Sequence, residues 1–201
     1  SDLAEMACQI EIEKCGEPIG KQDQYAAAVG GLKLYEFNPD ESVIVNPVLC
    51  SSEFQCKLNE STLIFYTGAT RTASSILSEQ TQNSSKQNIV PVLRRMACLA
   101  HEFKHEIESS DLNNLGELLK ENWSLKKGLA SGISNSLIDD MYDAGISAGA
   151  LGGKLLGAGA GGFMMFIADK KKHKQIIDAL SSYRRFEFNI ENAGSRVIYY
   201  G

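Results

Sequence analysis

The residues best suited to chemistry form a glycine-rich stretch at residues 152–162, Gly-Gly-Lys-Leu-Leu-Gly-Ala-Gly-Ala-Gly-Gly. Because glycine has no Cβ atom, this backbone can approach a bound phosphate or another backbone more closely than other sequences can. The stretch also matches the dinucleotide fingerprint Gly-x-Gly-x-x-Gly, which requires a strand before the glycines and a helix after them. We expect the reverse order, with a helix over residues 134–148 before the stretch and a short apolar strand over 162–168 after it. A glycine loop between a helix and a buried strand is therefore predicted, and a dinucleotide site of that type is not.

A carboxylate near the N-terminus is a second candidate. Residues 1–15 predict an amphipathic helix that stops at Gly16. At 100° per residue Glu11 falls in the middle of the apolar arc, which comprises Met6, Ile10, Leu3, Ala7, Ala4, Cys15, Cys8 and Ile12. A carboxylate buried there needs a cation, a metal ion or hydrogen-bond donors. Two interpretations stay open: an ion pair with Arg or Lys in the core, or a functional site.

A possible zinc motif is present at residues 101–105, His-Glu-Phe-Lys-His, where two histidines share one face of a predicted helix. A catalytic zinc ion also needs a third protein ligand and an open coordination position. The only other histidine, His173, lies far along the chain on a charged helix. The same segment fits an ordinary helix with the apolar stripe Met96, Leu99, Ala100, Phe103 and Ile107. We interpret the match as a coincidence and keep a metallohydrolase as an alternative class.

Hydrophobic periodicity and turn residues predict the elements that position these groups. Asp23 could cap a short alanine-rich turn behind it. We expect a hairpin of strands 32–37 and 42–45, a strand over 61–67, a helix from about Thr72, helices over about 89–109, 111–127, 134–148 and 169–182, and final strands near 184–190 and 195–200. The polar segment 78–88 is expected to be a boundary or a mobile loop. This pattern predicts an α+β fold with largely antiparallel sheets.

Composition narrows the function classes. The net charge of −5 over 201 residues, with no basic stripe, argues against a nucleic-acid partner. Five cysteines without a Cys-x-x-Cys spacing favour a reduced, cytoplasmic setting. No signal peptide or membrane span is visible, because Lys154 and many glycines interrupt the apolar tract 151–168. We therefore expect no membrane partner.

Several stretches together resemble the GHMP family of small-molecule kinases. The resemblance rests on Glu11 through the segment Gly16-x-Pro18-x-Gly20-x-x-Asp23-Gln24, and on the glycine-rich stretch, which resembles the third signature motif of the family. Within the family, the segments 65–74 and 121–127 are most similar to bacterial kinases of D-glycero-D-manno-heptose 7-phosphate. The resemblance implies ATP and Mg²⁺ as cofactors and phosphorylation of the anomeric hydroxyl of this sugar phosphate, giving the 1,7-bisphosphate.

The resemblance also implies a role for particular residues. Asp23 matches the catalytic aspartate that assists deprotonation of the sugar hydroxyl, and Glu11 matches the carboxylate that holds Mg²⁺. Phosphoryl transfer depends mainly on such positioning and charge neutralisation. The cofactor-binding candidates are Gly157, Gly159 and Gly161, and the substrate-binding candidates are Thr70, Arg71 and Gly20. Arg71 offers a bidentate fork to phosphate oxygens, although it is equally well explained as a surface cation at the head of a helix.

One departure from the family is important. In GHMP kinases an N-terminal portion carries a Pro-x-x-x-Gly-x-x-Ser-Ser-type loop around the ATP phosphates, and this sequence has no such loop. We therefore expect the remainder of a ribosomal-protein-S5-like first domain over residues 1–83, followed by a ferredoxin-like C-terminal domain over 84–201. The expected partner is the missing N-terminal portion of the same kinase, and homodimerisation is left open. Two other functions stay open, another sugar 1-kinase of the galactose or fucose type and a non-catalytic GHMP-like binding protein.

Overall fold

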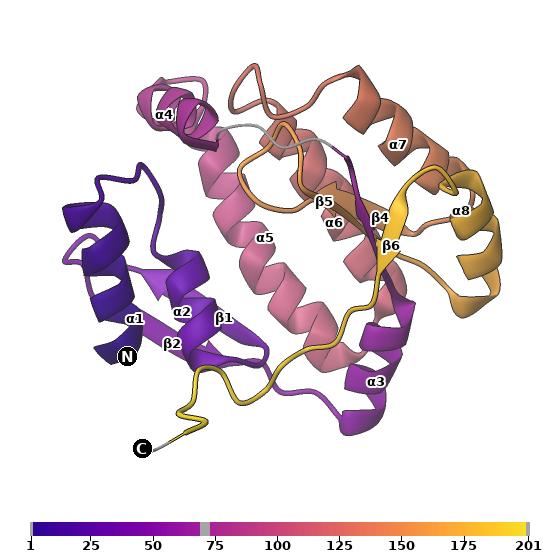
Figure 1. The fold of residues 1–201 in the computed structure, drawn as a ribbon, viewed down its shortest axis with the longest axis horizontal. Helices are drawn as coiled ribbons and strands as arrows, with labels where there is room; N and C mark the ends of the chain where they lie inside the picture. The colour runs from indigo at the N-terminus through magenta and orange to yellow at the C-terminus, as the bar shows by residue number, and fades with distance from the viewer. Residues whose placement is uncertain (1, 69–72, 200–201) are drawn as a thin grey trace. The chain divides into compact units, whose positions relative to one another are not determined.

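A four-stranded antiparallel sheet organises residues 50–188, the larger of two compact units (Figure 1). The computed structural model describes residues 2–68 and 73–199, without the side chains of 73–75. The strands lie in the order β4-β5-β3-β6, with bounds Thr62–Tyr66 for β3, Gly152–Leu155 for β4, Phe163–Ile167 for β5 and Arg184–Phe186 for β6. Helices separate β3 from β4 and β5 from β6, which gives the β-α-β-β-α-β order of ferredoxin-like folds. The predicted α+β class and ferredoxin-like fold are confirmed, although β3 lies before residue 84, where that domain was expected to begin.

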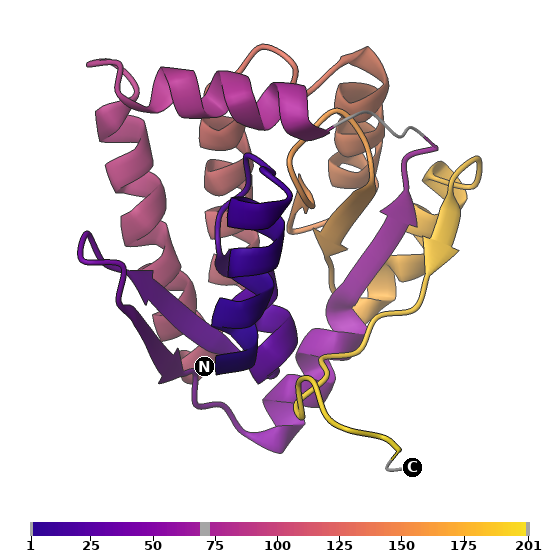
Figure 2. The ribbon, with the colours of Figure 1, turned by 60° about the vertical axis from the view of Figure 1, so that its left-hand side comes forward.

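Six α-helices accompany the sheet in this unit within the described residues. Their bounds are Ser52–Ser61 for α3, Ala73–Ser84 for α4, Val90–Ser109 for α5, Leu112–Lys127 for α6, Ser136–Ser147 for α7 and His173–Ala179 for α8, with a 3-10 turn, η2, at Lys170–Lys172. The sequence sets several starts, because a side-chain oxygen accepts from the first-turn backbone at Ser51, Asp111, Asn135 and Asp169. Helices α5 and α6 run side by side, and α4 lies across their ends (Figure 2).

The core of this unit joins the sheet to its helices. Its fully buried side chains include Phe65, Trp123, Ile138, Leu155, Met164, Phe166 and Ile176. Glycine lets α6 approach the edge strand, since a Cβ atom on Gly152 would lie 2.0 Å from the carbonyl oxygen of Gly116. The first part of the glycine-rich stretch therefore serves packing, and a strand forms where the sequence predicted a loop.

The smaller unit comprises residues 1–49 and 189–201. It contains α1 (Asp2–Cys8), the π-helical segment η1 (Gln9–Lys14), α2 (Gln22–Val29) and the antiparallel hairpin of β1 (Lys33–Phe37) and β2 (Val43–Pro47). Ala4, Cys8 and Tyr25 form its core. The C-terminal segment joins this unit through backbone bonds from Gly31 to Glu191 and from Ser195 to Ala28, 2.7 and 3.2 Å long.

Four predictions of secondary structure were wrong. The segment 52–61 forms α3, whereas no element was expected there, and 152–155 forms β4. The polar segment 78–88 was expected to be a loop, but α4 continues through residue 84. Contacts outside the segment stabilise that helix end, because Asn83 donates to the Leu129 carbonyl and Glu79 accepts from Ser131. The strand expected near 195–200 is not formed over the described residues 195–199.

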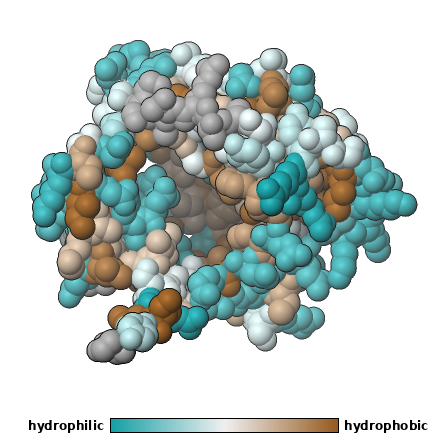
Figure 3. All heavy atoms as spheres, viewed as in Figure 1, coloured by the Kyte–Doolittle hydropathy of each residue, from teal (hydrophilic) through white to brown (hydrophobic). Residues whose placement is uncertain are grey.

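The N-terminal helix buries a narrower face than its apolar arc predicts. Ala4 and Cys8 are buried, whereas Leu3, Met6 and Ile10 are 53, 58 and 49 % exposed. Hydrophobic side chains accordingly lie at the surface over α1 and η1 (Figure 3). A helical wheel at 100° per residue also misplaces the side chains beyond Cys8, because η1 has π-helical hydrogen bonding with more residues per turn. The expected burial of Glu11 is therefore wrong, and this side chain is exposed.

The expected domain boundary between residues 83 and 84 falls at the end of α4, inside the larger unit. The compact units and the predicted domains therefore divide the chain differently.

Among the described residues, no helix combines the length and the apolar character needed to cross a lipid bilayer.

Candidate functional site

Glu11 and Asp23 lie on neighbouring helical segments of the smaller unit, joined through Gln24. The Nε2 atom of Gln24 donates to Glu11 Oε2 at 3.0 Å. Gln24 is only 7 % exposed, and its Oε1 has no hydrogen-bond partner among the described residues. Because a carboxylate accepts only, the amide must turn Nε2 toward Glu11. Within the described chain, Glu11 therefore binds an amide and does not form the core ion pair that was considered for it. The π-helical segment η1 that carries Glu11 is of a type that is frequent at functional sites.

Asp23 is exposed in the first turn of α2. Lys21 occupies the N-cap position, and no side chain caps this helix, so the proposed capping role of Asp23 is wrong. The structure shows no hydrogen bond or ion pair for the Asp23 carboxylate within residues 2–68 and 73–199. Local structure thus leaves the carboxylate unused, as a group that meets a substrate would be.

Gly20 precedes α2 and lines a cavity of about 700 Å³ in the smaller unit. Side chains from α1, η1 and the hairpin turn line the same cavity, among them Cys8, Ile12 and Phe37. A Cβ atom on Gly20 would lie 2.5 Å from Gln22 Oε1, so a larger residue would displace a side chain at the start of α2. Its place next to the Asp23 helix is compatible with the expected substrate contact.

A buried tyrosine holds the two helical segments together. The Tyr25 hydroxyl donates to Glu5, and Lys21 lies 3.5 Å from the same carboxylate. Burial, followed by the Glu5 bond, raises the pKa of Tyr25 to about 12. The Tyr25 bond in turn lowers the pKa of Glu5. This contact fixes α1 against α2, and thereby the segments that carry Glu11 and Asp23.

The glycine loop of the larger unit connects β4 to β5 over residues 156–162. Positive φ angles occur at Gly157 (83°), Gly159 (126°), Ala160 (62°) and Gly162 (103°), but not at the predicted Gly161. The loop is held on one side by Ile133, whose carbonyl accepts from the Ala160 N–H at 3.0 Å. On the other side, Lys126 Nζ donates to the Gly157 carbonyl. The loop is therefore a fixed turn between two strands, which also excludes the strand–glycine–helix order of a dinucleotide site.

Lys154 and Asn122 form a contact next to the glycine loop that the sequence interpretation did not single out. Lys154 extends from β4, directly before the loop, and its Nζ donates to Asn122 Oδ1 of α6 at 2.7 Å. Burial, with a smaller effect of the Lys126 charge, lowers the pKa of Lys154 to about 8. The signal in the sequence is a single lysine inside the apolar tract 151–168.

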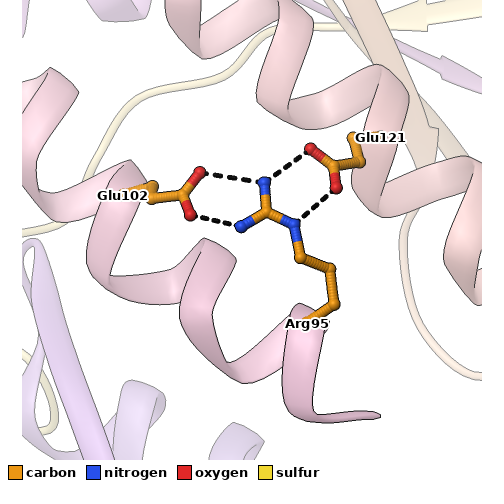
Figure 4. A network of polar contacts seen from close by, with 3 residues as sticks. All are labelled: Arg95, Glu102 and Glu121. Carbon is orange, nitrogen blue, oxygen red and sulfur yellow. Dashed lines mark hydrogen bonds and ion pairs between the residues drawn. The ribbon is translucent and has the colours of Figure 1, made fainter. Parts of the chain in front are cut away.

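The glutamate of the possible zinc motif, Glu102, takes part in a structural ion pair. Arg95 binds Glu102, the motif glutamate, and also Glu121 of α6, with Nε···Oε1 and Nη2···Oε2 distances to Glu121 of 2.6 and 2.8 Å (Figure 4). These bonds raise the pKa of Arg95 and lower that of Glu121. His101 and His105 are exposed, and the described residues contain no group of three potential metal ligands. The Arg95 cluster ties α5 to α6.

Two predicted substrate residues, Thr70 and Arg71, lie outside the described residues. The remaining candidates fall into two groups. Glu11, Gly20 and Asp23 belong to the smaller unit, and the glycine loop belongs to the larger one.

Comparison with known proteins identifies a family domain within the larger unit. Residues 103–185, from α5 through β6, match the family described as GHMP kinases C terminal. Residues 103–185 carry the C-terminal domain of the GHMP kinases. The glycine loop lies inside the matched range, whereas Glu11, Gly20 and Asp23 lie before it.

Relatives extend the similarity beyond this GHMP kinase domain. The D-glycero-alpha-D-manno-heptose 7-phosphate kinase of Campylobacter jejuni is 33% identical over 89% of the chain and 53% of its own length. The crystal structure of a D-glycero-D-manno-heptose 1-phosphate kinase from Bacteroides thetaiotaomicron is 26% identical with a TM-score of 0.72, covering 95% of this chain and 52% of that one. Methanococcus jannaschii mevalonate kinase shares the fold, with 21% identity and a TM-score of 0.67 over 94% of this chain and 56% of that one. The chain therefore spans about half the length of these relatives.

Proposed function

We propose that the full-length protein containing this GHMP kinase domain is an ATP-dependent sugar kinase that phosphorylates the anomeric hydroxyl of D-glycero-D-manno-heptose 7-phosphate. The similarity to the Campylobacter jejuni heptose 7-phosphate kinase carries the proposal. The fold and the unpaired Asp23 carboxylate support it. Since ATP and sugar phosphates are cytoplasmic metabolites, we place the reaction in the cytoplasm.

Asp23 takes the role of the proton acceptor in this proposal. Its carboxylate is exposed and makes no bond to the described part of the chain, so it is available to a sugar hydroxyl. A general base of this kind contributes roughly 10²- to 10⁴-fold to a rate. Tyr25 and Gln24 follow it in α2 and are both buried, which fixes the helix that presents Asp23.

Glu11 is the proposed magnesium ligand. Mg²⁺ in kinases is commonly held by one or two carboxylates together with substrate phosphates, so a single exposed carboxylate fits without a cluster of protein ligands. Gln24 occupies Glu11 Oε2, and this fixes the direction of the carboxylate. A bound Mg²⁺ ion would neutralise charge on the transferred phosphoryl group.

The proposed site is completed by the glycine loop, by Gly20 and by the segment with Thr70 and Arg71. We assign contact with the nucleotide or substrate to Gly157, Gly159 and Gly161, and contact with the sugar or its phosphate to Gly20, Thr70 and Arg71. An N-terminal portion of the same kinase would supply the loop around the ATP phosphates. It would also cover the exposed apolar face of Leu3, Met6 and Ile10.

Substitution of Asp23 in the full-length protein tests the proposal. Asp23→Asn keeps the size of the side chain but removes its basicity, so we expect turnover to fall by about 100-fold or more. Because the carboxylate makes no bond in the described chain, the melting temperature should change little. ADP release with Mg-ATP and heptose 7-phosphate measures turnover.

Asp178→Asn provides the matched control, because Asp178 is an exposed aspartate on α8 of the larger unit. It should keep full activity. Near-complete activity of Asp23→Asn would show that Asp23 is not the base.

A further inference from the structure

The segment 129–135 connects α6 to α7 without forming a helix or a strand. It is nevertheless buried in part, since the side chains of Leu129 and Ile133 are 1 and 0 % exposed. A buried chain without regular structure must find hydrogen-bond partners in other elements, and those partners determine where it lies. Residues 129–133, which we call the bridging segment, contact both α4 and the glycine loop.

Helix α4 holds one side of the bridging segment. Glu79 accepts from the Ser131 N–H at 2.9 Å and from the Ser131 hydroxyl at 3.1 Å, with one carboxylate oxygen for each bond. Asn83, one turn later on α4, donates to the Leu129 carbonyl at 2.9 Å. The bonds from Ser131 lower the pKa of Glu79, so its carboxylate is ionised near neutral pH and both bonds are charge-assisted. Glu79 therefore fixes the middle of the bridging segment.

The other side of the bridging segment holds the glycine loop. Two residues after Ser131, the Ile133 carbonyl accepts from the Ala160 N–H at 3.0 Å. Ala160 is fully buried and has a φ angle of 62°. A left-handed backbone is unfavourable for a residue with a Cβ atom, and it persists only where the surrounding structure maintains it. The bond from Ala160 to Ile133 is therefore a restraint on the shape of the loop.

We propose that Glu79 is a positioning residue for the glycine loop. Its carboxylate fixes Ser131, the short chain from Ser131 fixes Ile133, and Ile133 holds Ala160 in its left-handed conformation. The inference rests on the proposed kinase function, in which this loop contacts the nucleotide or the substrate. A protein whose binding-competent loop is only partly populated binds its ligand more weakly in proportion to that fraction.

A purely structural role is the competing explanation. In that case Glu79 only fastens α4, and its loss would lower the melting temperature without changing the glycine loop of the folded protein. A positioning role predicts two further effects. Loss of Glu79 should loosen Ala160 in the folded protein and should raise KM more than it lowers kcat, because a bound ligand restores the ordered loop.

Residue-resolved hydrogen exchange of the full-length protein, without ligand, measures the loop directly. The probe is the Ala160 N–H, whose acceptor is the Ile133 carbonyl. The Leu156 N–H is an internal control, because it donates to the Phe163 carbonyl at 2.8 Å where the two strands close the loop. In Glu79→Ala we expect exchange at Ala160 to be about 10-fold faster or more, with little change at Leu156.

Further variants separate the two explanations. Glu79→Gln keeps an acceptor for the Ser131 N–H and offers its amide to the hydroxyl, so exchange and KM should stay within about 2-fold of the wild type. Ser131→Ala loses only the hydroxyl bond and should accelerate exchange at Ala160 less than Glu79→Ala does. This milder variant keeps the test decisive if Glu79→Ala fails to fold. Glu117→Ala removes an exposed partner of Lys120 on α6 and, as the control, should match the wild type.

Kinetics with Mg-ATP and heptose 7-phosphate give the second readout. Glu79→Ala should raise KM for at least one substrate roughly 5-fold, with kcat within about 2-fold of the wild type. Unchanged exchange at Ala160 in the folded Glu79 and Ser131 variants would overturn the inference and leave the kinase function intact. Faster exchange with unchanged KM for both substrates would overturn it as well. Absence of turnover in the wild type, with faster exchange in Glu79→Ala, would contradict the proposed function and leave the effect of Glu79 on the loop standing.

Discussion

At the scale of residues, Gln24 links the two carboxylates of the smaller unit. It follows Asp23 in the chain and binds Glu11 through space, so one buried amide fixes the direction of the proposed magnesium ligand next to the proposed base. Its Oε1 atom is buried without a partner in the described residues, which costs stability. A buried polar atom without a partner is uncommon in folded proteins, so a positioning role for Gln24 would explain why this residue stands here.

Replacement of Gln24 by Met tests this positioning role. The change removes both the Glu11 bond and the unpaired acceptor, so the free energy of unfolding should change by less than about 1 kcal/mol. The Glu11 carboxylate loses its fixed direction, and we expect the Mg²⁺ concentration for half-maximal activity to rise roughly 10-fold, since outer-shell partners typically contribute 10- to 100-fold.

Direct Mn²⁺ binding, followed by electron paramagnetic resonance in the presence of ADP, should weaken in parallel. Gln22→Met is the control, because Gln22 is an exposed residue at the start of the same helix. Unchanged metal dependence in Gln24→Met, with both proteins folded, would rule out the positioning role.

At the scale of elements, the glycine loop depends on two different properties of glycine. Gly157 and Gly159 both have positive φ angles, but only at Gly159 would a Cβ atom meet another segment. A Cβ atom on Gly159 would lie 2.8 Å from Ile133 Cα, whereas a Cβ atom on Gly157 would have no atom within 4 Å. Substitutions at these two glycines therefore separate the cost of backbone strain from the cost of a steric clash.

Alanine substitutions at these two glycines give the prediction. Gly157→Ala should cost about 1 kcal/mol of unfolding free energy, from left-handed strain alone. Gly159→Ala should cost a further 1–3 kcal/mol or so, because the Ile133 backbone must move. Chemical denaturation of the two variants measures the difference. Equal losses would show that the loop is not fixed against Ile133.

Sequence patterns predicted the helices that have a clear hydrophobic periodicity. Helices α5, α6 and α7 were predicted within about two residues, since their apolar stripes and the caps Asp111 and Asn135 are local signals. The strand β4 was missed because Gly152 and Gly153 are poor strand formers, and only pairing with β5 and packing on α6 make them extended. Long-range contacts of this kind leave no periodic signal.

The residues of the candidate site came from the sequence to a similar extent, and their roles stay predictions. Glu11, Asp23 and the glycine loop followed from motif resemblance, yet Glu11 was expected to be buried, and the helical wheel failed where η1 changes its hydrogen bonding. The partners Gln24 and Lys154 were overlooked, because their roles depend on contacts with Glu11 and Asn122, 13 and 32 residues away.

At the scale of the whole molecule, the smaller unit is assembled from both ends of the chain. Its hairpin has only two strands, and such a sheet is marginal by itself. Apolar side chains stay exposed on α1 and η1, and Val197 and Ile198 are 64 and 91 % exposed near the C-terminus. The chain spans about half the length of its relatives. The exposed apolar surfaces are therefore consistent with the proposal that a further portion of the kinase covers them.

ADP release by the full-length protein with Mg-ATP and a panel of sugars tests the proposed kinase activity and its substrate most directly. The panel contains heptose 7-phosphate, heptose 1-phosphate, galactose, fucose and mevalonate, because the names of the two heptose kinase relatives place the phosphate at different positions. We expect efficient turnover with heptose 7-phosphate and weak turnover with neutral sugars, because a neutral sugar leaves the proposed phosphate contact of Arg71 unfilled. Preference for a neutral sugar would contradict the proposed substrate. No turnover with any acceptor, from protein that is folded, would contradict the proposed kinase activity.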